Sequence, residues 1–349
     1  MSEEAEGALA KAADAGIHRL AIPTPFRIGR VNTYLIDDDP LTLVDSGPNS
    51  GTALDTLERA LATHGRRVED LGLIAISHQH IDHLGLVSIL ARRSGAEVAA
   101  LDLLAPWVEH WSEAMDADDA FAERIMAEHG IPEDVRHALI GVSQSYRGWG
   151  AAATVTRPLA AGSELRLRDR TLRVHHRPGH SPSDTIFHDE QEGIVLGADH
   201  LIKHIFSTPL ISRPLTADSV QDAEGGGGGG ETAERPHALE IYIESLHATR
   251  AMEGVDLVLA GHGEPVTDHV ALIDERFRFH ARRAEKIRRL IAASPITAYE
   301  IAQSLWGNVA VTQAYLTLSE VLGHVDLLVT DERVVQQRDG GVVRFAAVG

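Results

Sequence analysis

The sequence predicts an α/β protein in which helices cover the faces of β-sheets. Short β-prone runs alternate with amphipathic segments over residues 1–280, and a different texture of short helices and a terminal hairpin follows. The 349 residues, 44% of them hydrophobic, are enough for a full core in one large domain or two unequal ones. No run approaches the ~18 consecutive apolar residues of a membrane span, so membrane association is not expected.

The first part of the chain is expected to alternate strands with helices. Leu54, Leu57 and Leu61 recur at helical spacing and predict an amphipathic helix. Continuous apolar runs that end in Asp, Ser, Gly or Pro predict strands. The expected strands are Ile17–Ile22, Val31–Ile36, Leu41–Val44, Leu71–Ile76 and Glu97–Leu101, and the expected helices are Ala53–Thr63 and Leu84–Arg92.

Residues 102–150 break this rhythm and are expected to form a helical insertion, which holds three of the four tryptophans. Strands and helices then resume. The expected strands are Val155–Arg157, Glu164–Leu167, Thr171–His176, Thr185–His188, Gly193–Leu196 and Val255–Ala260, and the expected helices are Ala238–Met252 and Val270–Ala293. Residues 222–233 include six consecutive glycines, Gly225–Gly230, and predict a flexible loop.

The C-terminal residues are expected to form a separate small module. Thr297–Leu305 and Val311–Leu322 are predicted as helices, and Asp326–Val335 and Val342–Phe345 as a hairpin. This pattern predicts a large α/β domain over residues 1–280 and a winged-helix-like module over residues 281–349.

The charge and the lack of cysteine exclude several classes of function. The formal net charge of −19 repels phosphate backbones and anionic membranes. The absence of cysteine excludes disulfides, thiolate metal sites and cysteine nucleophiles. The N-terminus is acidic and has no apolar signal core, so we expect a cytoplasmic location.

The run from His78 to His83 is the strongest chemical motif. His78 and His80 stand two apart after a predicted strand, so they point the same way and suit one ion, whereas Asp82 and His83 suit a second ion beside it. Imidazole with carboxylate favours zinc, iron or manganese over calcium. A solvated histidine-rich loop is the alternative. It loses force because His180, Asp199 and His262 also follow predicted strands, each beside a glycine or one residue removed from one.

These motifs, in this order, resemble the metallo-β-lactamase superfamily over about residues 17–280. The resemblance implies an αββα sandwich in which His78, His80 and His180 bind one metal, Asp82, His83 and His262 bind a second, and Asp199 bridges both. It also implies that Asp45 orients the ligand loop, although a plain turn residue is the alternative. Zinc is the expected metal, with iron and manganese as alternatives.

Two such metals share a hydroxide that is nucleophilic at neutral pH, so the resemblance predicts a hydrolase. Asp82 and Asp199 are the expected catalytic carboxylates, which hold or relay the proton of the water. Ile202 stands where acyl-homoserine lactonases carry a tyrosine, and the C-terminal module resembles that of carrier-protein thioesterases and of a lactamase-like endoribonuclease.

We expect the substrate to be an acyl thioester, small or carrier-bound, and we do not expect nucleic acid. Between Pro295 and Glu332 there is no Lys or Arg, whereas a recognition helix needs cations. A single-strand endoribonuclease, a persulfide dioxygenase and a non-catalytic winged-helix regulator are the alternatives. The residues expected to face the substrate are Trp107, Trp111, Tyr146, Trp149, His200 and Lys203. The alternative for the aromatic residues is that they form the core of the insertion.

Overall fold

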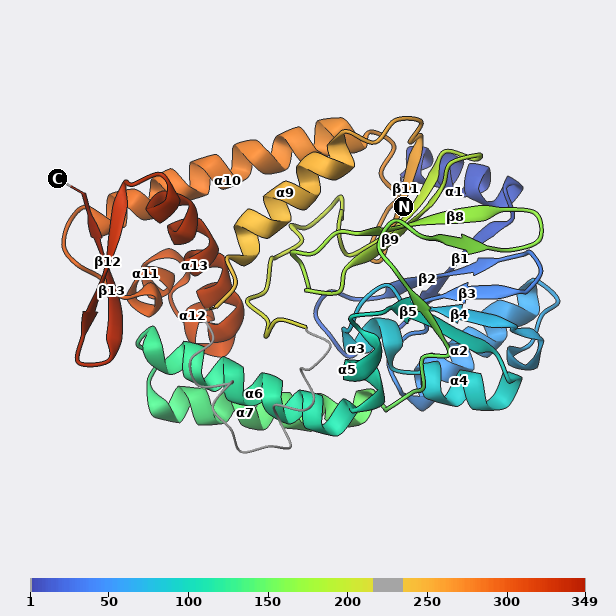
Figure 1. Cartoon of the computed structure of the whole chain (residues 1–349), viewed down its shortest axis with the longest axis horizontal. Coiled ribbons are helices and arrows are strands. Elements are labelled where there is room, and N and C mark those ends of the chain that lie inside the picture. The colour runs from blue at the N-terminus through green and yellow to red at the C-terminus, as the bar shows by residue number, and fades with distance from the viewer. Residues whose placement is uncertain (1, 216–234, 349) are drawn as a thin grey trace.

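Two β-sheets face each other in the computed structural model, which describes residues 2–215 and 235–348 (Figure 1). The first sheet has six strands in the order β1-β2-β3-β4-β5-β6, and the second has five in the order β11-β10-β9-β8-β7. The bounds of the first sheet are β1 Ile17–Ile22, β2 Val31–Ile36, β3 Thr42–Val44, β4 Leu73–Ala75, β5 Glu97–Leu101 and β6 Arg157–Leu159. Those of the second are β7 Glu164–Arg166, β8 Thr171–His176, β9 Thr185–Asp189, β10 Ile194–Ala198 and β11 Leu257–Ala260.

Helices cover the outer face of each sheet, which gives the expected αββα sandwich. The first sheet is covered by α2 Gly51–Thr63, α3 Ile81–Leu84 and α4 Val87–Ser94, with a short 3-10 turn at Val68–Asp70. Helix α1 Glu3–Asp14 instead packs its Ala8 and Ala12 into the core between the sheets. The second sheet is covered by α9 Ala238–Arg250 and α10 His269–Ile291. The hydrophobic clusters reflect these layers, because strand residues alternate between two faces.

The alternation can be followed residue by residue in β2 and β3. Leu35 and Leu43 face α2 and α4, whereas Ile36 and Val44 face the second sheet. On the far side, Val195 of β10 packs against α9. The sandwich therefore has one apolar core between its two sheets and one under each helical layer.

The insertion and the C-terminal module share a core of their own and form a second lobe, on the left of Figure 1. The insertion consists of α5 Ala105–Glu109, α6 Trp111–Glu128, α7 Glu133–Tyr146 and a 3-10 turn at Arg147–Trp149. The module consists of α11 Ala298–Trp306, α12 Val309–Thr312, α13 Ala314–Thr330 and the hairpin β12 Val334–Asp339 and β13 Val342–Ala347. Phe121 and Ile125 of α6 pack in the same cluster as Ile287 of α10 and Leu322 of α13. The expected boundary at residue 280 falls inside α10, so one continuous helix joins both parts of the chain.

Most expected elements overlap the observed ones. The strand expected at Val155–Arg157 overlaps β6 only at Arg157, and the helix expected at Val311–Leu322 is divided between α12 and α13. Residues 326–330 were predicted as strand but belong to α13, whose buried residues include Val325, Asp326 and Leu328. Helix α1 was not predicted; Ser2 caps it and three alanines, Ala5, Ala8 and Ala12, form its buried face. The expected loop at Gly225–Gly230 lies outside the described residues. Within the described ranges, no helix combines the length and apolarity needed to cross a bilayer.

We expect Leu322→Ala to lower the free energy of unfolding by about 2–5 kcal/mol, because it empties part of the core that α6, α10 and α13 share. Hydrogen exchange should also accelerate in α6, which contributes to that core. The matched control is Leu316→Ala on the same helix, where the side chain is 39% exposed; its effect should stay within about 0.5 kcal/mol. Unchanged protection of α6 in a destabilised Leu322→Ala variant would contradict a shared core.

Candidate metal centre

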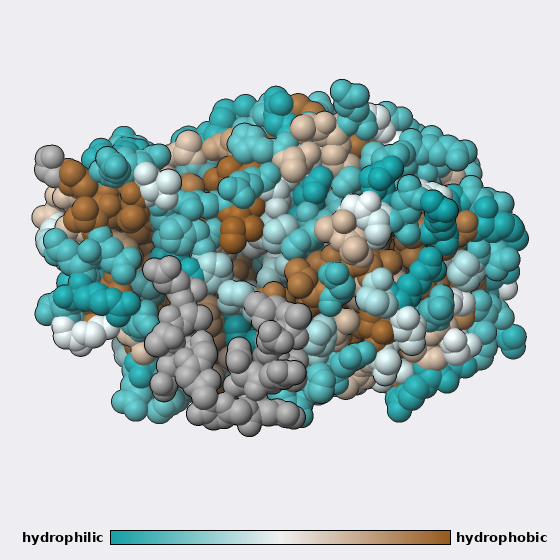
Figure 2. Space-filling model, viewed as in Figure 1, coloured by the Kyte–Doolittle hydropathy of each residue, from teal (hydrophilic) through white to brown (hydrophobic). Residues whose placement is uncertain are grey.

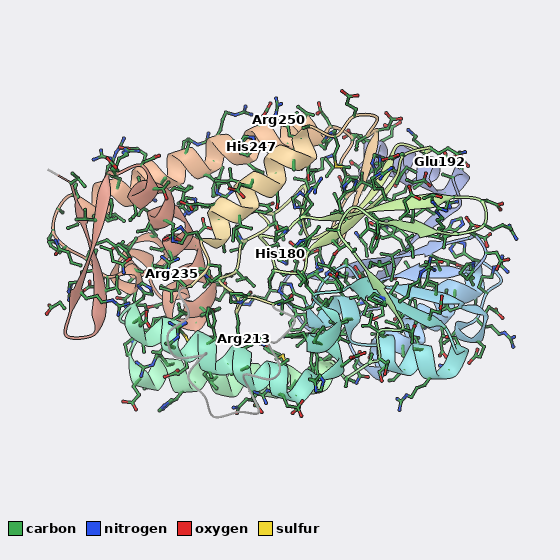
Figure 3. All side chains as sticks on the ribbon, viewed as in Figure 1. His180, Glu192, Arg213, Arg235, His247 and Arg250 are labelled. Atoms are coloured by element: carbon green, nitrogen blue, oxygen red, sulfur yellow. The ribbon has the colours of Figure 1, made fainter. Side chains whose placement is uncertain are left out.

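Four chain segments meet at one edge of the sandwich and bring the expected ligands together. Strand β4 leads into the loop that carries His78 and His80, and α3 supplies Asp82 and His83. Strands β10 and β11 are parallel, so their carboxyl ends lie at the same edge, where Asp199 and His262 follow them. His180 comes from the turn between β8 and β9 and lies in the middle of the molecule, between the two lobes (Figure 3).

The first ligand group consists of His78, His80, His180 and Asp199, whose ligand atoms lie within 4.8 Å of one another. His80 Nδ1 is 3.1 Å from His78 Nε2 and 3.0 Å from His180 Nε2. His180 Nε2 is 3.5 Å from Asp199 Oδ2. A tetrahedral ion with bonds of about 2.0–2.1 Å places its ligand atoms about 3.3 Å apart. The spacing of the first ligand group therefore fits one transition-metal ion.

The second ligand group consists of Asp82, His83 and His262, again within 4.8 Å of one another. His262 Nε2 is 3.3 Å from Asp82 Oδ2 and 3.4 Å from Asp199 Oδ2. His83 Nε2 is 3.4 Å from Asp199 Oδ1. Asp199 therefore touches members of both groups, as a bridging carboxylate would.

The ligand atoms themselves indicate that a cation fits between them. His83 Nε2, His262 Nε2 and Asp199 Oδ1 are buried and have no hydrogen-bond partner among the described residues. Buried polar atoms are almost always hydrogen-bonded or coordinate a metal, because leaving them unpaired costs free energy. Imidazole nitrogens and a carboxylate oxygen that converge without hydrogen bonds to one another are suitable ligands for divalent transition-metal ions.

The other nitrogen of four of these histidines is held by the protein, which fixes which nitrogen faces the centre. Asp45 Oδ2 lies 2.7 Å from His83 Nδ1, and Ser77 Oγ donates to that same carboxylate atom at 2.8 Å. Ser77 Oγ also lies 2.9 Å from His78 Nδ1. The structure thus places Asp45 in contact with His83 and Ser77 of the ligand loop.

Backbone carbonyls hold two further histidines. His262 Nδ1 is 2.9 Å from the carbonyl oxygen of Arg30, and His180 Nδ1 is 3.2 Å from that of Thr208. Sequence reasoning missed Ser77, Arg30 and Thr208. Ser77 adjoins His78 in the sequence and could have been considered. Arg30 and Thr208 contribute backbone carbonyls, which every residue has, so their residue types could not identify them.

Close packing at the centre restricts the backbone at two positions. A Cβ atom on Gly261 would lie 2.3 Å from Asp199 Oδ1 and 2.8 Å from His83 Cε1, so only glycine fits there. Asp45 has a φ of 60°, a left-handed conformation that is uncommon for a residue with a side chain. Strain of this kind is tolerated where the surrounding structure holds the residue in place, and here the hydrogen bonds to Ser77 and His83 do so.

The two ligand groups differ in their protonation. Burial and then the neighbouring His180 lower the pKa of His80 to about 3. Burial also opposes a charge on His262, but the nearby carboxylates outweigh it and raise its pKa to about 9. The same balance, led by Asp199 and Asp45, raises the pKa of His83 well above its usual value. In the metal-free chain, protons on the second ligand group therefore supply the positive charge that the carboxylates require.

A hydrogen-bonded network fixes the ligand loop to the segment that carries His180. Ser183 Oγ donates to Gln79 Oε1 at 2.6 Å and accepts from the backbone N–H of Gln79 at 3.2 Å. Asp184 is fully buried and accepts from Ser181 Oγ at 2.7 Å. Burial raises the pKa of Asp184 to about 6. The two sheets are thus connected next to the metal ligands as well as through them.

The residues expected to face the substrate divide into buried and peripheral ones. Trp107 and Trp111 are buried in the core under the first sheet, with ring centroids 5.1 Å apart, and Trp107 Nε1 donates to Asp118 at 2.9 Å. This arrangement favours the alternative, that these two rings form core. His200 is also buried, and its Nε2 lies 2.8 Å from Thr249 Oγ1 on α9.

The other three expected residues lie nearer the surface. Lys203 pairs with Glu4 at 3.2 Å, so its amine points to α1. The carbonyl of Trp149 accepts from Asn49 N at 2.7 Å and packs on Gly85, two residues after His83. Tyr146 is 37% exposed and contacts Phe26 edge to face at 5.4 Å. Sequence reasoning missed Phe26. It belongs to the loop that ends at Arg30, whose carbonyl oxygen contacts His262.

Comparisons with known proteins agree with this geometry. A family model described as the metallo-beta-lactamase superfamily matches residues 27–262. The probable metallo-hydrolase YqjP of Bacillus subtilis is 29% identical over 326 residues, which is 93% of this chain and 96% of that protein. In fold, the chain is similar to a metallo-beta-lactamase family protein of Thermus thermophilus, with a TM-score of 0.74, 23% identity and coverage of 95% of this chain and 99% of that one. It is also similar to a beta-lactamase domain protein of Burkholderia ambifaria, with a TM-score of 0.76, 24% identity and coverage of 95% and 92%.

Titration of the metal-free chain with Zn²⁺ at pH 7.5 should release protons, because His262 must lose one before Nε2 can coordinate. Calorimetry in buffers of different ionisation enthalpy measures this release, which should fade as the pH rises through about 9. A raised folded-state pKa also means that His262 stabilises the metal-free chain fully below about pH 6.5, and that this contribution is lost as the pH rises. His262→Gln should release fewer protons. Heats of binding that do not depend on the buffer would contradict the proposed protonation.

Proposed function

The chain belongs to the metallo-beta-lactamase superfamily, and from that premise we propose that it hydrolyses an acyl thioester with two transition-metal ions. The metal-dependent hydrolase is the part that the family and the His/Asp cluster support directly. The observation that carries the dinuclear proposal is the division of seven side chains into two groups that share Asp199. The dinuclear state, zinc as the metal and the thioester substrate are our proposals.

The residues named above would hold the two ions. Bound divalent ions lower the pKa of water enough to make it nucleophilic near neutral pH, and they polarise the carbonyl that is attacked. Hydrolysis then forms a C–O bond, breaks the C–S bond and yields a carboxylic acid and a thiol. A thiolate leaves without a strong acid beside it, because thiols have a pKa of about 8.5.

The carboxylates of the centre have distinct positions for handling the proton. Asp199 is enclosed by His83, His180 and His262. Its pKa lies well below the usual value, because His83 and His262 outweigh burial. Asp82 has a slightly more exposed side chain and one imidazole contact, at His262. We therefore assign to Asp82 the role of accepting the proton of the attacking water, and to Asp199 that of an ionised carboxylate shared by the two ligand groups.

The surroundings of the centre favour an apolar acyl group over a polyanion. Figure 2 shows apolar surface residues gathered between the two lobes, where Figure 3 places His180. All three arginines of the insertion contact carboxylates: Arg124 pairs with Glu128, Arg136 with Glu123, and Arg147 with Asp116 and Asp119. The many remaining acidic residues of the insertion would repel a phosphate backbone.

The basic residues of α10 are the observation that favours the endoribonuclease, and most of them are paired. Arg288 and Arg289 contact Glu285, and Arg283 lies 3.8 Å from Glu320. A groove for single-stranded nucleic acid needs cations free to track the backbone, together with aromatic platforms. We therefore keep the thioester as the proposed substrate class.

The purified chain should hold about two transition-metal ions, and His80→Ala or Asp199→Ala should lose metal and turnover together while the fold remains. Metal analysis, activity and circular dichroism on the same preparation measure the three properties. His64→Ala is a suitable control, since His64 belongs to neither ligand group and its ring lies 4.3 Å from that of His18 in a tilted arrangement. Full turnover of either ligand variant after chelation would refute the assignment of the centre.

Thioester cleavage should exceed RNA cleavage on one preparation, because the insertion carries more acidic groups than its arginines neutralise. Acyl-CoA, a small acyl thioester and an RNA oligomer are the substrates to compare. The test is repeated with three exposed cations of α10, Arg282, Lys286 and Arg289, changed to Gln. Efficient RNA cutting that falls steeply with salt and with these changes, while thioesters stay intact, would show that the endoribonuclease is correct.

A further inference from the structure

Residues 199–215, which we call the strap, connect the metal centre to the second lobe. The strap begins at Asp199, whose carbonyl accepts a hydrogen bond from Ser207 Oγ. Its Thr208 carbonyl faces His180 Nδ1 at 3.2 Å, and its Leu210 N–H donates to the His180 carbonyl at 3.4 Å. The strap therefore contains one member of the first ligand group, Asp199, and is hydrogen-bonded to a second, His180.

The far end of the strap is fixed to α13 and α6. Ile211 N–H donates to Ser319 Oγ at 3.3 Å, and the Ile211 carbonyl accepts from Tyr315 Oη. Arg213 Nε donates to Asp118 at 2.8 Å. These contacts hold the strap against two helices, α6 and α13, that pack in one core.

The middle of the strap is held by one buried arginine of α10. Arg276 Nη2 donates to three strap carbonyls, those of Ile202 at 2.8 Å, Lys203 at 3.0 Å and Ile205 at 3.3 Å. Its guanidinium lies 4.2 Å from the ring centroid of Phe206, and that ring stacks on the ring of Phe279 with centroids 3.8 Å apart. A planar guanidinium can bond several carbonyls and stack on a ring at once, which a lysine ammonium cannot.

The buried charge of Arg276 is compensated mainly by the strap carbonyls. Glu275, its carboxylate partner at 3.3 Å, has an exposed side chain, whereas only 4% of Arg276 is exposed. Burying a charge is costly unless hydrogen bonds compensate it, and the three strap carbonyls do so. The observed conformation of the segment between Asp199 and Thr208 thus satisfies the guanidinium through three carbonyls.

We propose that Arg276 is a positioning residue for the metal centre, which acts through the strap to hold Asp199 and His180 at their distances from His78 and His80. This proposal rests on the metal-binding part of the proposed function and not on the thioester. It makes α10 and the second lobe part of the centre, although neither supplies a metal ligand. Groups hydrogen-bonded directly to metal ligands typically change metal affinity by about 10–100-fold, and Arg276 acts one contact further out, so we expect an effect at the lower end of that range.

The test compares Arg276→Met with Arg283→Met in the full-length chain. Arg283 lies two turns further along α10, is also partly buried and lies over two rings, those of Phe279 and Trp306, but no hydrogen bond to the strap is shown for it. Competition between each metal-free variant and a chromophoric chelator for Co²⁺ gives the affinity, and thermal unfolding gives the stability. Arg276→Met should bind Co²⁺ at least about 10-fold more weakly than Arg283→Met at comparable stability.

Three further arms keep the outcome decisive. Arg276→Lys should remain weak, and millimolar guanidinium should restore part of the Co²⁺ affinity of Arg276→Ala. If Arg276→Met does not fold, Phe206→Leu, which removes the stacked ring, should weaken Co²⁺ binding in the same direction. Equal affinities of Arg276→Met and Arg283→Met would overturn the positioning role while the wild-type chain still binds Co²⁺. A wild-type chain that does not bind Co²⁺ would instead overturn the metal-dependent function.

Discussion

Five imidazoles and two carboxylates converge on one buried volume, and the rest of the molecule is organised around that convergence. Ligand atoms 3.0–3.5 Å apart with no hydrogen bond between several of them are unfavourable without a cation or protons. Such an arrangement persists only if contacts on the side away from the centre hold the ligand side chains in place. The sandwich provides this by ending β4, β10 and β11 at the same edge, where short loops carry the ligands.

The supports behind the ligands act at increasing numbers of contacts from the ligand atoms. Asp45 and Ser77 act next to the first motif, Arg30 and Thr208 act through carbonyls, and Arg276 acts through the strap. The second lobe belongs to this series, because α10 runs without a break from the sandwich into the module. We therefore infer that the module supports the metal centre and does not recognise nucleic acid independently.

The sequence was sufficient for the sandwich and for the ligand groups, and the reasons are physical. Strands β4, β10 and β11 are buried on both faces and give continuous apolar runs, so each of them was predicted. Strands β1, β2, β5 and β8 were predicted with their observed bounds, and His180 lies in the turn after β8, whereas the other ligands follow β4, β10 and β11. The ligands stand at the ends of those runs, which made their convergence predictable. Residues 326–330 were mispredicted because an apolar run has no period by which a buried helix end differs from a strand.

The substrate-facing residues were harder to predict from sequence. An aromatic ring in a core and one at a pocket are identical in sequence, and Trp107 and Trp111 pack in the core, whereas Tyr146 is at the surface beside Phe26. The shared core of α6 and α13 was equally hidden, because its members are far apart in sequence and only their packing relates them. Each ligand group, by contrast, draws on both sheets: His78 and His83 follow β4 of one, and His180 and His262 follow strands of the other. Two bound ions would thus act as cross-links, each closing a loop of the chain many residues long. In a chain without cysteine they would take the place of disulfides, and part of the folding free energy would depend on the supply of metal.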